Sequence, residues 1–407
     1  MKTKQFFLAA LTAGLIVLGS GTAMAIEAKD IAIHGFITQG FLFSSDNNYL
    51  SANTKDGSFE FSRMGLNFSL EPYEKLRIGI QLFSRDLGTE GNNDIVLDWG
   101  YLDYRWKDYL GVRVGKIKTP YGLYNEGRDM DFLHTSILLP QSVYPENMRD
   151  LLVSIQGACL YGTVEMGTLG GLDYQVIGGT ENIDASAPFY SDLFNRATVG
   201  TPFYGAPIAG LTANMDYMVG GSLQWKTPLD GLRLGVSDLI NKIDNTATVG
   251  GIKVLADMDV KRWSVFSAEY LRGNFGLAGE YFRGKIDIDV RAPAAGMALP
   301  IDLDLEGYYG QISYRFNKWL ELGTYYSEFY PNANDKDGNG WKAVGQPDFL
   351  AWQKDWTISV RFDPLERLVL KFETHFIDGA GQLTLAANPD GLDKSWTLYA
   401  VQCSYNF

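Results

Sequence analysis

Apolar and polar residues alternate along almost the whole chain from residue 31 onward. This period of two is typical of β-strands that have one apolar and one polar face. The pattern predicts sixteen strands, at 31–43, 59–70, 76–85, 95–106, 110–118, 153–166, 172–179, 217–227, 232–240, 257–271, 275–284, 305–316, 320–330, 352–362, 367–377 and 396–407. We therefore expect an all-β protein.

The connections between these predicted strands alternate strictly between short and long. A short turn follows every even-numbered strand, and a long segment follows every odd-numbered one. The long segments are 44–58, 86–94, 119–152, 180–216, 241–256, 285–304, 331–351 and 378–395. A transmembrane β-barrel has an even number of antiparallel strands, with tight turns at one end and long loops at the other. The pattern favours such a barrel over a soluble sandwich, whose long loops need not gather at one end.

Two strands show what the alternation places on each face. In 64–70 the apolar face holds Met64, Leu66, Phe68 and Leu70, and the polar face holds Arg63, Asn67 and Ser69. In 356–362 the apolar face holds Trp356, Ile358, Val360 and Phe362, and the polar face holds Thr357, Ser359 and Arg361. A soluble barrel would show the same alternation, so this pattern alone leaves both architectures open.

Aromatic residues favour the membrane architecture, because they cluster near the ends of the predicted strands. Girdles of amphipathic rings at the two lipid–water boundaries are typical of transmembrane barrels. The residues that suggest such girdles are Trp106, Tyr109, Trp225, Trp263, Trp319, Tyr325, Tyr326, Trp352 and Trp356. We therefore expect a 16-stranded antiparallel transmembrane β-barrel over residues 26–407.

Composition excludes several other classes of protein. The formal net charge of −13 argues against a nucleic-acid-binding protein, and a mean hydropathy of −0.10 argues against a bundle of membrane-spanning helices. Two cysteines cannot form a disulfide framework. With only three histidines and no G-x-S-x-G sequence, the chain does not point to an enzyme.

The first 25 residues have the pattern of a cleaved secretory signal. Lys2 and Lys4 precede an apolar run at 6–18, and residues 23–25 read Ala-Met-Ala, a small-residue cleavage site. We therefore expect residues 1–25 to be a signal peptide that directs export.

The C-terminal residues 399–407 (YAVQCSYNF) resemble the terminal strand of Gram-negative outer-membrane barrels, which alternates and ends in Phe. Residues 113–123 (RVGKIKTPYGL) resemble the strand that enters loop 3 of porins, including the phosphate- and polyphosphate-selective group, and 124–129 and 139–142 continue this likeness. The resemblance implies a location in the outer membrane, among lipid and lipopolysaccharide. It also implies a homotrimer of 16-stranded barrels with loop 3 folded inward.

The segment 119–152 is one of the two longest predicted loops and the best candidate for folding into the barrel. Its acidic residues Glu126, Asp129 and Asp131 would face a basic wall on the inward parity of neighbouring strands. That wall would consist of Arg63, Arg77, Arg85, Arg105 and Arg113. Charges opposed across a constriction would produce a transverse field that sets the selectivity of a pore.

No cofactor is expected, with one weak exception. Asp335, Asp337 and Asn339 have the alternate spacing of oxygen ligands in the first half of a calcium loop. The twelfth position is Gln346, which lacks the bidentate carboxylate of a high-affinity site. An ordinary polar turn in a loop explains the same residues.

Together these observations predict an outer-membrane porin, a water-filled channel for passive diffusion of small hydrophilic solutes and ions. One alternative is a substrate-selective channel for phosphate-like or organic anions. A second is a structural or adhesive barrel, in which 119–152 would lie outside the lumen.

Overall fold

The structure is a computed structural model that describes residues 30–50, 53–88, 90–185, 190, 192, 194, 196 and 205–407. The predicted signal peptide lies outside these residues. Strands dominate the described chain: β1 (Ala32–Ser44), β2 (Ser62–Tyr73), β3 (Leu76–Asp86), β4 (Ile95–Lys107), β5 (Leu110–Lys118), β6 (Ser154–Glu165), β7 (Gly171–Thr180), β8 (Ile208–Lys226), β9 (Leu232–Val249), β10 (Ile252–Arg272), β11 (Phe275–Ala292), β12 (Met297–Arg315), β13 (Leu320–Tyr330), β14 (Gln353–Leu365), β15 (Leu368–Gly379) and β16 (Ser395–Asn406).

The helices are short and lie in the connections. They are the α-helices α2 (Arg149–Leu152) and α4 (Asn339–Ala343), and the 3₁₀ turns η2 (Thr54–Asp56), η3 (Asn125–Gly127), η4 (Asp131–Leu133), η5 (Glu146–Met148), η6 (Gly167–Leu169), η7 (Pro293–Ala295), η8 (Asp348–Ala351) and η9 (Leu385–Ala387). Within the described residues, no helix has the length and apolar character needed to cross a bilayer.

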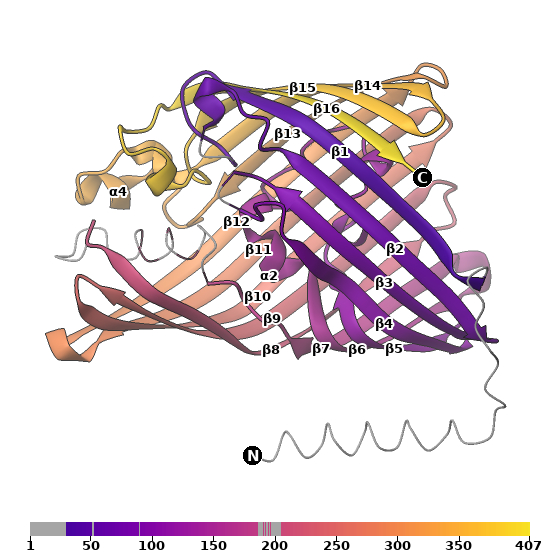
Figure 1. The fold of residues 1–407 in the computed structure, drawn as a ribbon, viewed down its shortest axis with the longest axis horizontal. Helices are drawn as coiled ribbons and strands as arrows, with labels where there is room; N and C mark the ends of the chain where they lie inside the picture. Colours follow the sequence, from indigo (N-terminus) through magenta and orange to yellow (C-terminus); the bar gives the residue numbers. More distant parts are fainter. Residues whose placement is uncertain are drawn as a thin grey trace, which may run out of the picture.

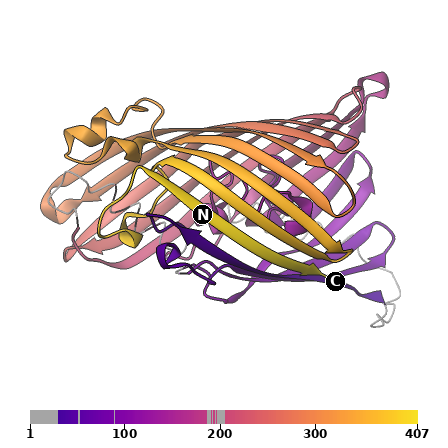
Figure 2. The same cartoon turned by 90° about the horizontal axis from the view of Figure 1, so that it is seen from above.

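The sixteen strands form one closed antiparallel barrel, in which each strand pairs with its neighbours in sequence (Figures 1 and 2). The first and last strands close it, with Phe36 opposite Asn406. Backbone hydrogen bonds between Gly35 and Phe407, at 2.9 and 3.0 Å, extend the seam. Closure pairs the backbone groups of both edge strands, as a sheet surrounded by hydrocarbon requires. The predicted fold is confirmed.

Large apolar side chains cover the outer face of the barrel, and polar ones line the inner face. Leu102, Val176 and Ile358 are each about half exposed on the outside. Arg63 and Lys371, by contrast, point inward and are buried. An apolar belt of this extent on a protein surface is explained by contact with lipid.

Strands β8 to β12 are longer than the sequence pattern predicts, and the predicted loops 241–256 and 285–304 are wrong. Val249 pairs with Ile252 across a two-residue turn, in which Gly250 and Gly251 both have positive φ. Such a turn suits the twist of a hairpin. The other segment is a hairpin closed near Gly296.

The physical reason is a change of surroundings along these strands. On β11 the outward residues change from Leu277 and Tyr281 to Lys285 and Asp289, while the inward residues become Ile288 and its apolar neighbours. The alternation therefore continues beyond the lipid, but its polar face now points outward. A prediction that requires an apolar outer face therefore places the loop-side ends of these strands too early.

Two aromatic residues assigned to the girdles point into the barrel instead. Trp263 is only 3% exposed and packs against Phe282, with ring centroids 4.5 Å apart. Tyr325 is equally buried and lies beside His375. Alternation alone did not distinguish these rings from the exposed ones, such as Trp106, Trp319 and Trp356, which lie on the outer face as predicted.

Candidate constriction site

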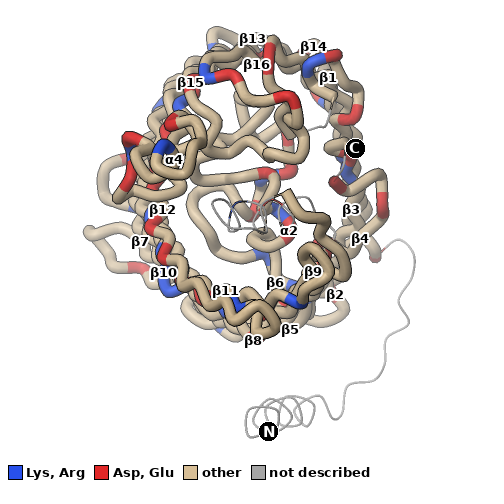
Figure 3. The backbone as a smooth tube through the Cα atoms, turned by 90° about the vertical axis from the view of Figure 1, so that its left-hand side faces the viewer, with Lys and Arg blue, Asp and Glu red and all other residues tan. Residues whose placement is uncertain are grey.

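Loop 3, residues 119–152, leaves β5 and ends in α2, which lies inside the ring of strands in the view along the barrel (Figure 3). Its base is closed by the N–H of Thr119, which donates to the carbonyl of Val153 at 3.0 Å. The side-chain amide of Asn125 donates to the carbonyl and hydroxyl oxygens of Thr119 at 3.0 and 2.8 Å. Thr119 and Asn125 are fully buried, so the loop starts from a fixed, desolvated base.

Arg149, on α2, joins the end of loop 3 to the barrel wall. Its guanidinium lies 2.9 Å from the carboxylate of Asp98 on β4 and 2.6 Å from that of Asp129 in the loop. The ammonium of Lys118 contacts the same two carboxylates at 2.8 and 3.1 Å. Burial favours protonation of Asp129, but Arg149 and then Lys118 hold its pKa well below the usual range. These four residues, here called the Arg149 cluster, balance their charges in a buried site.

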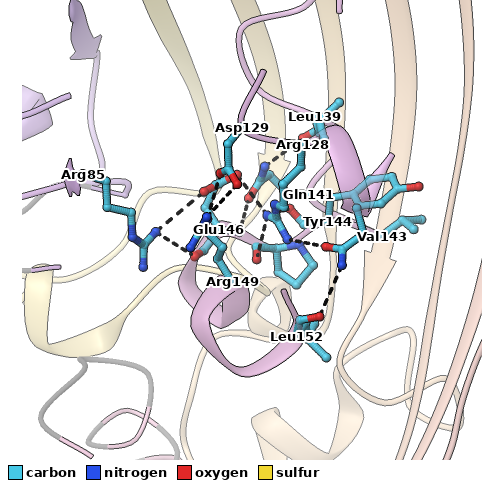
Figure 4. Close-up of polar contacts among 12 residues, drawn as sticks. Arg85, Arg128, Asp129, Leu139, Gln141, Val143, Tyr144, Glu146, Arg149 and Leu152 are labelled. Carbon is cyan, nitrogen blue, oxygen red and sulfur yellow. Dashed lines mark hydrogen bonds and ion pairs between the residues drawn. The ribbon is translucent and has the colours of Figure 1, made fainter. Parts of the chain in front are cut away.

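Glu146 lies between two guanidinium groups (Figure 4). Arg128, in the same loop, contacts one carboxylate oxygen at 3.0 Å, and Arg85 on β3 approaches the other at 3.7 Å. Arg85 also pairs with Asp150 at 3.0 Å. Arg128 is fully buried and donates to the carbonyl of Tyr144 at 3.2 Å. This group therefore ties loop 3 both to itself and to β3.

Asp131 attaches the loop to the seam of the barrel. Its carboxylate accepts hydrogen bonds from Thr38 on β1 at 2.5 Å and from Ser404 on β16 at 3.2 Å. Arg63 on β2 lies 3.5 Å from the same carboxylate. The first two strands and the last one thus hold one loop residue together.

A second wall anchor comes from β15. Glu373 accepts the backbone N–H groups of Ile137 and Leu138 at 2.8 and 2.9 Å. Lys371 donates to the carbonyl of Ser136 at 2.8 Å. Glu373 and Lys371 are almost fully buried. Buried charges therefore hold the loop backbone itself.

A third anchor is the carboxylate of Glu280 on β11. It accepts hydrogen bonds from the N–H of Leu123 at 2.9 Å, from the hydroxyl of Tyr309 at 2.7 Å and from that of Ser267 at 2.5 Å. The hydroxyl of Tyr144 also donates to it. Loop 3 is thereby fastened to strands around the whole barrel and forms a fixed partition across the lumen.

We predicted that the three loop acids face the basic wall across a constriction and so produce a transverse field. For two of these acids the prediction is wrong. Asp129 and Asp131 lie in direct contact with Arg149 and Arg63, respectively. Of the predicted basic wall, Arg63 and Arg85 reach the loop. These charges neutralise one another because the loop packs directly against the wall.

On the turn side of the loop, three of the charged residues that were predicted to line the constriction remain accessible beside the wall. Arg113 pairs with Asp103 at 3.0 Å, and Arg77 is exposed on the same face, opposite Asp103 in the strand register. The guanidinium of Arg113 lies 4.2 Å from the ring centroid of Tyr161. Glu126 is exposed and accepts a hydrogen bond from a wall residue of β7. We call Arg77, Arg113 and Glu126 the turn-side group.

Arg105 does not belong to a constriction. Its guanidinium is half exposed and pairs at 3.8 Å with Asp108, in the turn between β4 and β5. The residue shares the inward parity of its strand, but it lies too close to the turn to reach loop 3.

Several residues that hold loop 3 were not predicted as site residues. They are Asp98, Lys118, Glu146, Arg149, Glu280, Arg361, Lys371 and Glu373. The sequence contained a signal for some of them, because charged residues at inward positions of a barrel strand need a partner in the lumen. It did not contain the identity of that partner.

The proposed calcium loop is organised around a backbone turn. The carboxylate of Asp335 accepts the N–H groups of Asn339 and Gly340, at 2.8 and 2.9 Å, where α4 begins. Across the described part of the chain, no group of three or more His, Cys, Asp or Glu side chains is placed to hold a metal ion. Asp337 and Asn339 therefore stay a prediction from spacing alone.

A polar cavity of about 280 Å³ lies between β3, β4 and α2, on the loop side of the partition. Its lining includes three cations and six carboxylates: Arg85, Lys116 and Arg149, with Glu90, Asp94, Asp98, Asp150, Glu181 and Asp184. We call it the loop-side cavity.

Solved structures share this fold. The barrel resembles the outer-membrane expressed OmpT of Vibrio cholerae, with a TM-score of 0.59 and 11% identity over 94% of this chain and all of that one. An in-vitro folded, trimeric form of OmpT from Vibrio cholerae has a TM-score of 0.54 and 12% identity, over 93% of this chain and 99% of that one. An anion-selective porin from Comamonas acidovorans has a TM-score of 0.54 and 15% identity, also over 93% of this chain and 99% of that one.

No protein-family model matches the sequence, and no curated protein matches it either. At such low identities the structural likeness concerns the fold. It agrees with the resemblance to porins that residues 113–123 and the last strand suggested.

Proposed function

We propose that this chain is an outer-membrane porin, a water-filled channel for passive diffusion of small hydrophilic solutes and ions. One observation carries the proposal: loop 3 is held inside a closed 16-stranded barrel by buried charges on the wall. A barrel of this strand number is wide enough to enclose an aqueous channel. The inward loop then narrows it, and permeation involves no chemical step.

The same observation opposes the adhesive alternative, which needs loop 3 outside the lumen. The apolar outer face would contact membrane lipid, and the charged outward residues of β9 to β12 would lie among lipopolysaccharide head groups. The trimeric form of OmpT supports a homotrimer for this chain as well.

An anion-selective channel is the second candidate function. The turn-side group favours it, since it holds two arginines and one acid, with Asp103 as a second acid that pairs with Arg113. The Comamonas acidovorans neighbour is described as anion-selective. The loop-side cavity favours cations instead, because its lining contains more acidic than basic residues.

Replacing Arg77 and Arg113 together with serine is expected to shift selectivity toward cations. Both substitutions remove positive charge from the accessible inner wall on the turn side of loop 3. The measurement is the reversal potential of single channels in planar bilayers under a KCl gradient.

Arg105→Ser is the control, because it removes one arginine from the exposed end of β4, next to the turn. It should leave the reversal potential where it is. An unchanged reversal potential in the double variant would show that the turn-side group does not line the path. Absence of any conductance in the native protein would refute the channel itself.

The surroundings of Glu90 predict a second property of the channel, an ion selectivity that depends on pH. Burial raises the pKa of Glu90 to about 7, against the opposing effect of Arg85. The carboxyl is therefore neutral below this pH and negative above it. Because Glu90 lines the loop-side cavity, we expect the reversal potential to move toward cation preference between about pH 6 and about pH 8.

The neighbouring groups should not mimic this shift. Burial favours protonation of Glu146 and Asp150, but nearby arginines lower both pKa values, so these acids stay charged. Burial lowers the pKa of His134 to about 4, which keeps it neutral over the same range. The variant Glu90→Gln should lose the pH-dependent shift, and its persistence at full size would exclude Glu90 as the source.

A further inference from the structure

The inner wall of the barrel becomes apolar toward the loop end of β9 to β12. Inward residues nearer the turns include Glu280 and Tyr309, which are polar, whereas those beyond them include Met258, Ile286 and Ile288. All three of these apolar side chains are buried. An aqueous channel gains nothing from an apolar wall, so this stretch of wall must be covered by something other than water.

Two parts of the described chain cover some of this wall. Tyr190 and Phe194 belong to the same apolar cluster, and α2 contributes Leu151 and Leu152. Between α2 and the wall remains a cavity of about 90 Å³, lined by Met148, Leu151 and their apolar neighbours. A cavity of about 150 Å³ with such a lining holds a benzene molecule. The volume here suits a smaller group, such as a branched alkyl chain.

Two residues that line this cavity, Trp263 and Asn241, have a buried polar side-chain atom without a hydrogen-bond partner among the described residues, and the acceptor of Asn241 points to a ligand. Asn241 on β9 lines the cavity and is 2% exposed. Its side-chain oxygen has no hydrogen-bond partner among the described residues. A buried acceptor without a donor costs free energy, which a ligand with an N–H group would recover.

The apolar cavity adjoins the loop-side cavity, because Met148 and Leu151 line both. In the loop-side cavity, Glu181 uses one carboxylate oxygen to contact Lys116 at 3.2 Å. Its other oxygen is buried and has no partner in the described chain. With acids in excess around it, this end of the site favours a positive charge.

We propose that the two cavities form one binding site for small cationic amines that carry a branched alkyl group and an N–H donor. The alkyl group would occupy the space beside Ile288, and the ammonium would lie toward Glu181. The inference rests on the proposed function, because a solute reaches both cavities through the lumen.

Leucinamide is the probe that matches this description, and glycinamide is the same cation without the isobutyl group. In single-channel recordings we expect leucinamide to block the current at a concentration at least about tenfold below that needed for glycinamide. N-acetylleucine, which has the same alkyl group but a negative charge, should block no better than glycinamide. Equal block by leucinamide and glycinamide would overturn the proposal.

Two variants test the two ends of the site. Ile288→Phe fills the apolar cavity and should remove the advantage of leucinamide over glycinamide. The matched control Leu277→Phe adds the same ring to the outer face of β11 and should keep that advantage. Glu181→Gln should weaken the block by both cations. Block that Ile288→Phe leaves unchanged would contradict the assignment.

Saturation-transfer NMR on the detergent-solubilised protein provides a readout that does not need conductance. The methyl signals of leucinamide should receive saturation from the native protein and from Leu277→Phe, but much less from Ile288→Phe. If the channel fails to conduct yet this difference appears, the binding site stands and the porin function falls. If the channel conducts without the difference, only the binding site is refuted.

Discussion

Replacing Glu373 with alanine is expected to open the channel wider. The substitution leaves the N–H groups of Ile137 and Leu138 without their acceptor. Hydrogen bonds to a buried charge contribute about 1.5–3 kcal/mol each. A loss of about 3 kcal/mol shifts the equilibrium between the docked and the released loop by more than about a hundredfold. Single-channel conductance and open-channel noise should therefore both rise.

Thr374→Ala is the matched control, since this neighbour points to the outer face of β15. Its conductance should equal that of the native channel. Glu373→Gln keeps one acceptor oxygen but no charge. Its conductance should lie between that of the native channel and that of Glu373→Ala. A native conductance in Glu373→Ala would mean that the remaining anchors hold the loop without Glu373.

Replacing Arg149 with methionine is expected to produce the largest loss of stability. Asp98 and Asp129 would then share only Lys118 as a cation in a buried site. Removing one partner of a buried ion pair costs about 3–5 kcal/mol. Urea unfolding of the protein in lipid vesicles, followed by tryptophan fluorescence, would measure the loss.

The dependence of this loss on pH gives the prediction a sharper form. In the native protein the pKa of Asp129 is lowered, so its contribution to stability is present above the ordinary pKa of the carboxyl and is lost only as the pH falls through the lowered value. Without Arg149 the pKa of Asp129 rises, and protonation relieves the unpaired charge. The destabilisation should therefore be smaller at about pH 4 than at about pH 8.

Two comparisons decide whether the Arg149 cluster causes the effect. Arg105→Met removes an exposed arginine and should change the free energy of unfolding by less than about 0.5 kcal/mol. The double variant Arg149→Met with Asp129→Asn should recover part of the lost stability. A double variant as unstable as the sum of the single ones would show that the two side chains act independently.

The barrel with its inward loop also explains why many anchors of loop 3 are charged. The inner wall at this level faces water wherever the loop does not cover it, so its side chains have to be polar. A loop that docks against such a wall needs complementary charges, as Glu373 and Lys371 provide for its backbone. Apolar contacts hold other parts of the loop. Ile137 and Leu138 share an apolar cluster with residues of β1, β15 and β16, and α2 packs against the apolar inner wall of β9 to β12.

By itself the sequence determined the number of strands, the two faces of most of them and the loop that enters the lumen. These follow from local patterns, because water on one side and lipid on the other impose the alternation residue by residue. The inward direction of Arg63 and the entry of residues 119–152 into the lumen could therefore be predicted.

Only the tertiary structure decided which polar groups meet. Asp131 contacts Ser404, which lies 273 residues later, and Leu138 contacts Glu373, 235 residues later. Such pairs depend on the closure of the barrel and on the path of loop 3 across it, which no local pattern records. The same holds for Ile288, whose inward direction is visible in the alternation, whereas the cavity beside it exists only because α2 packs against β9 to β12.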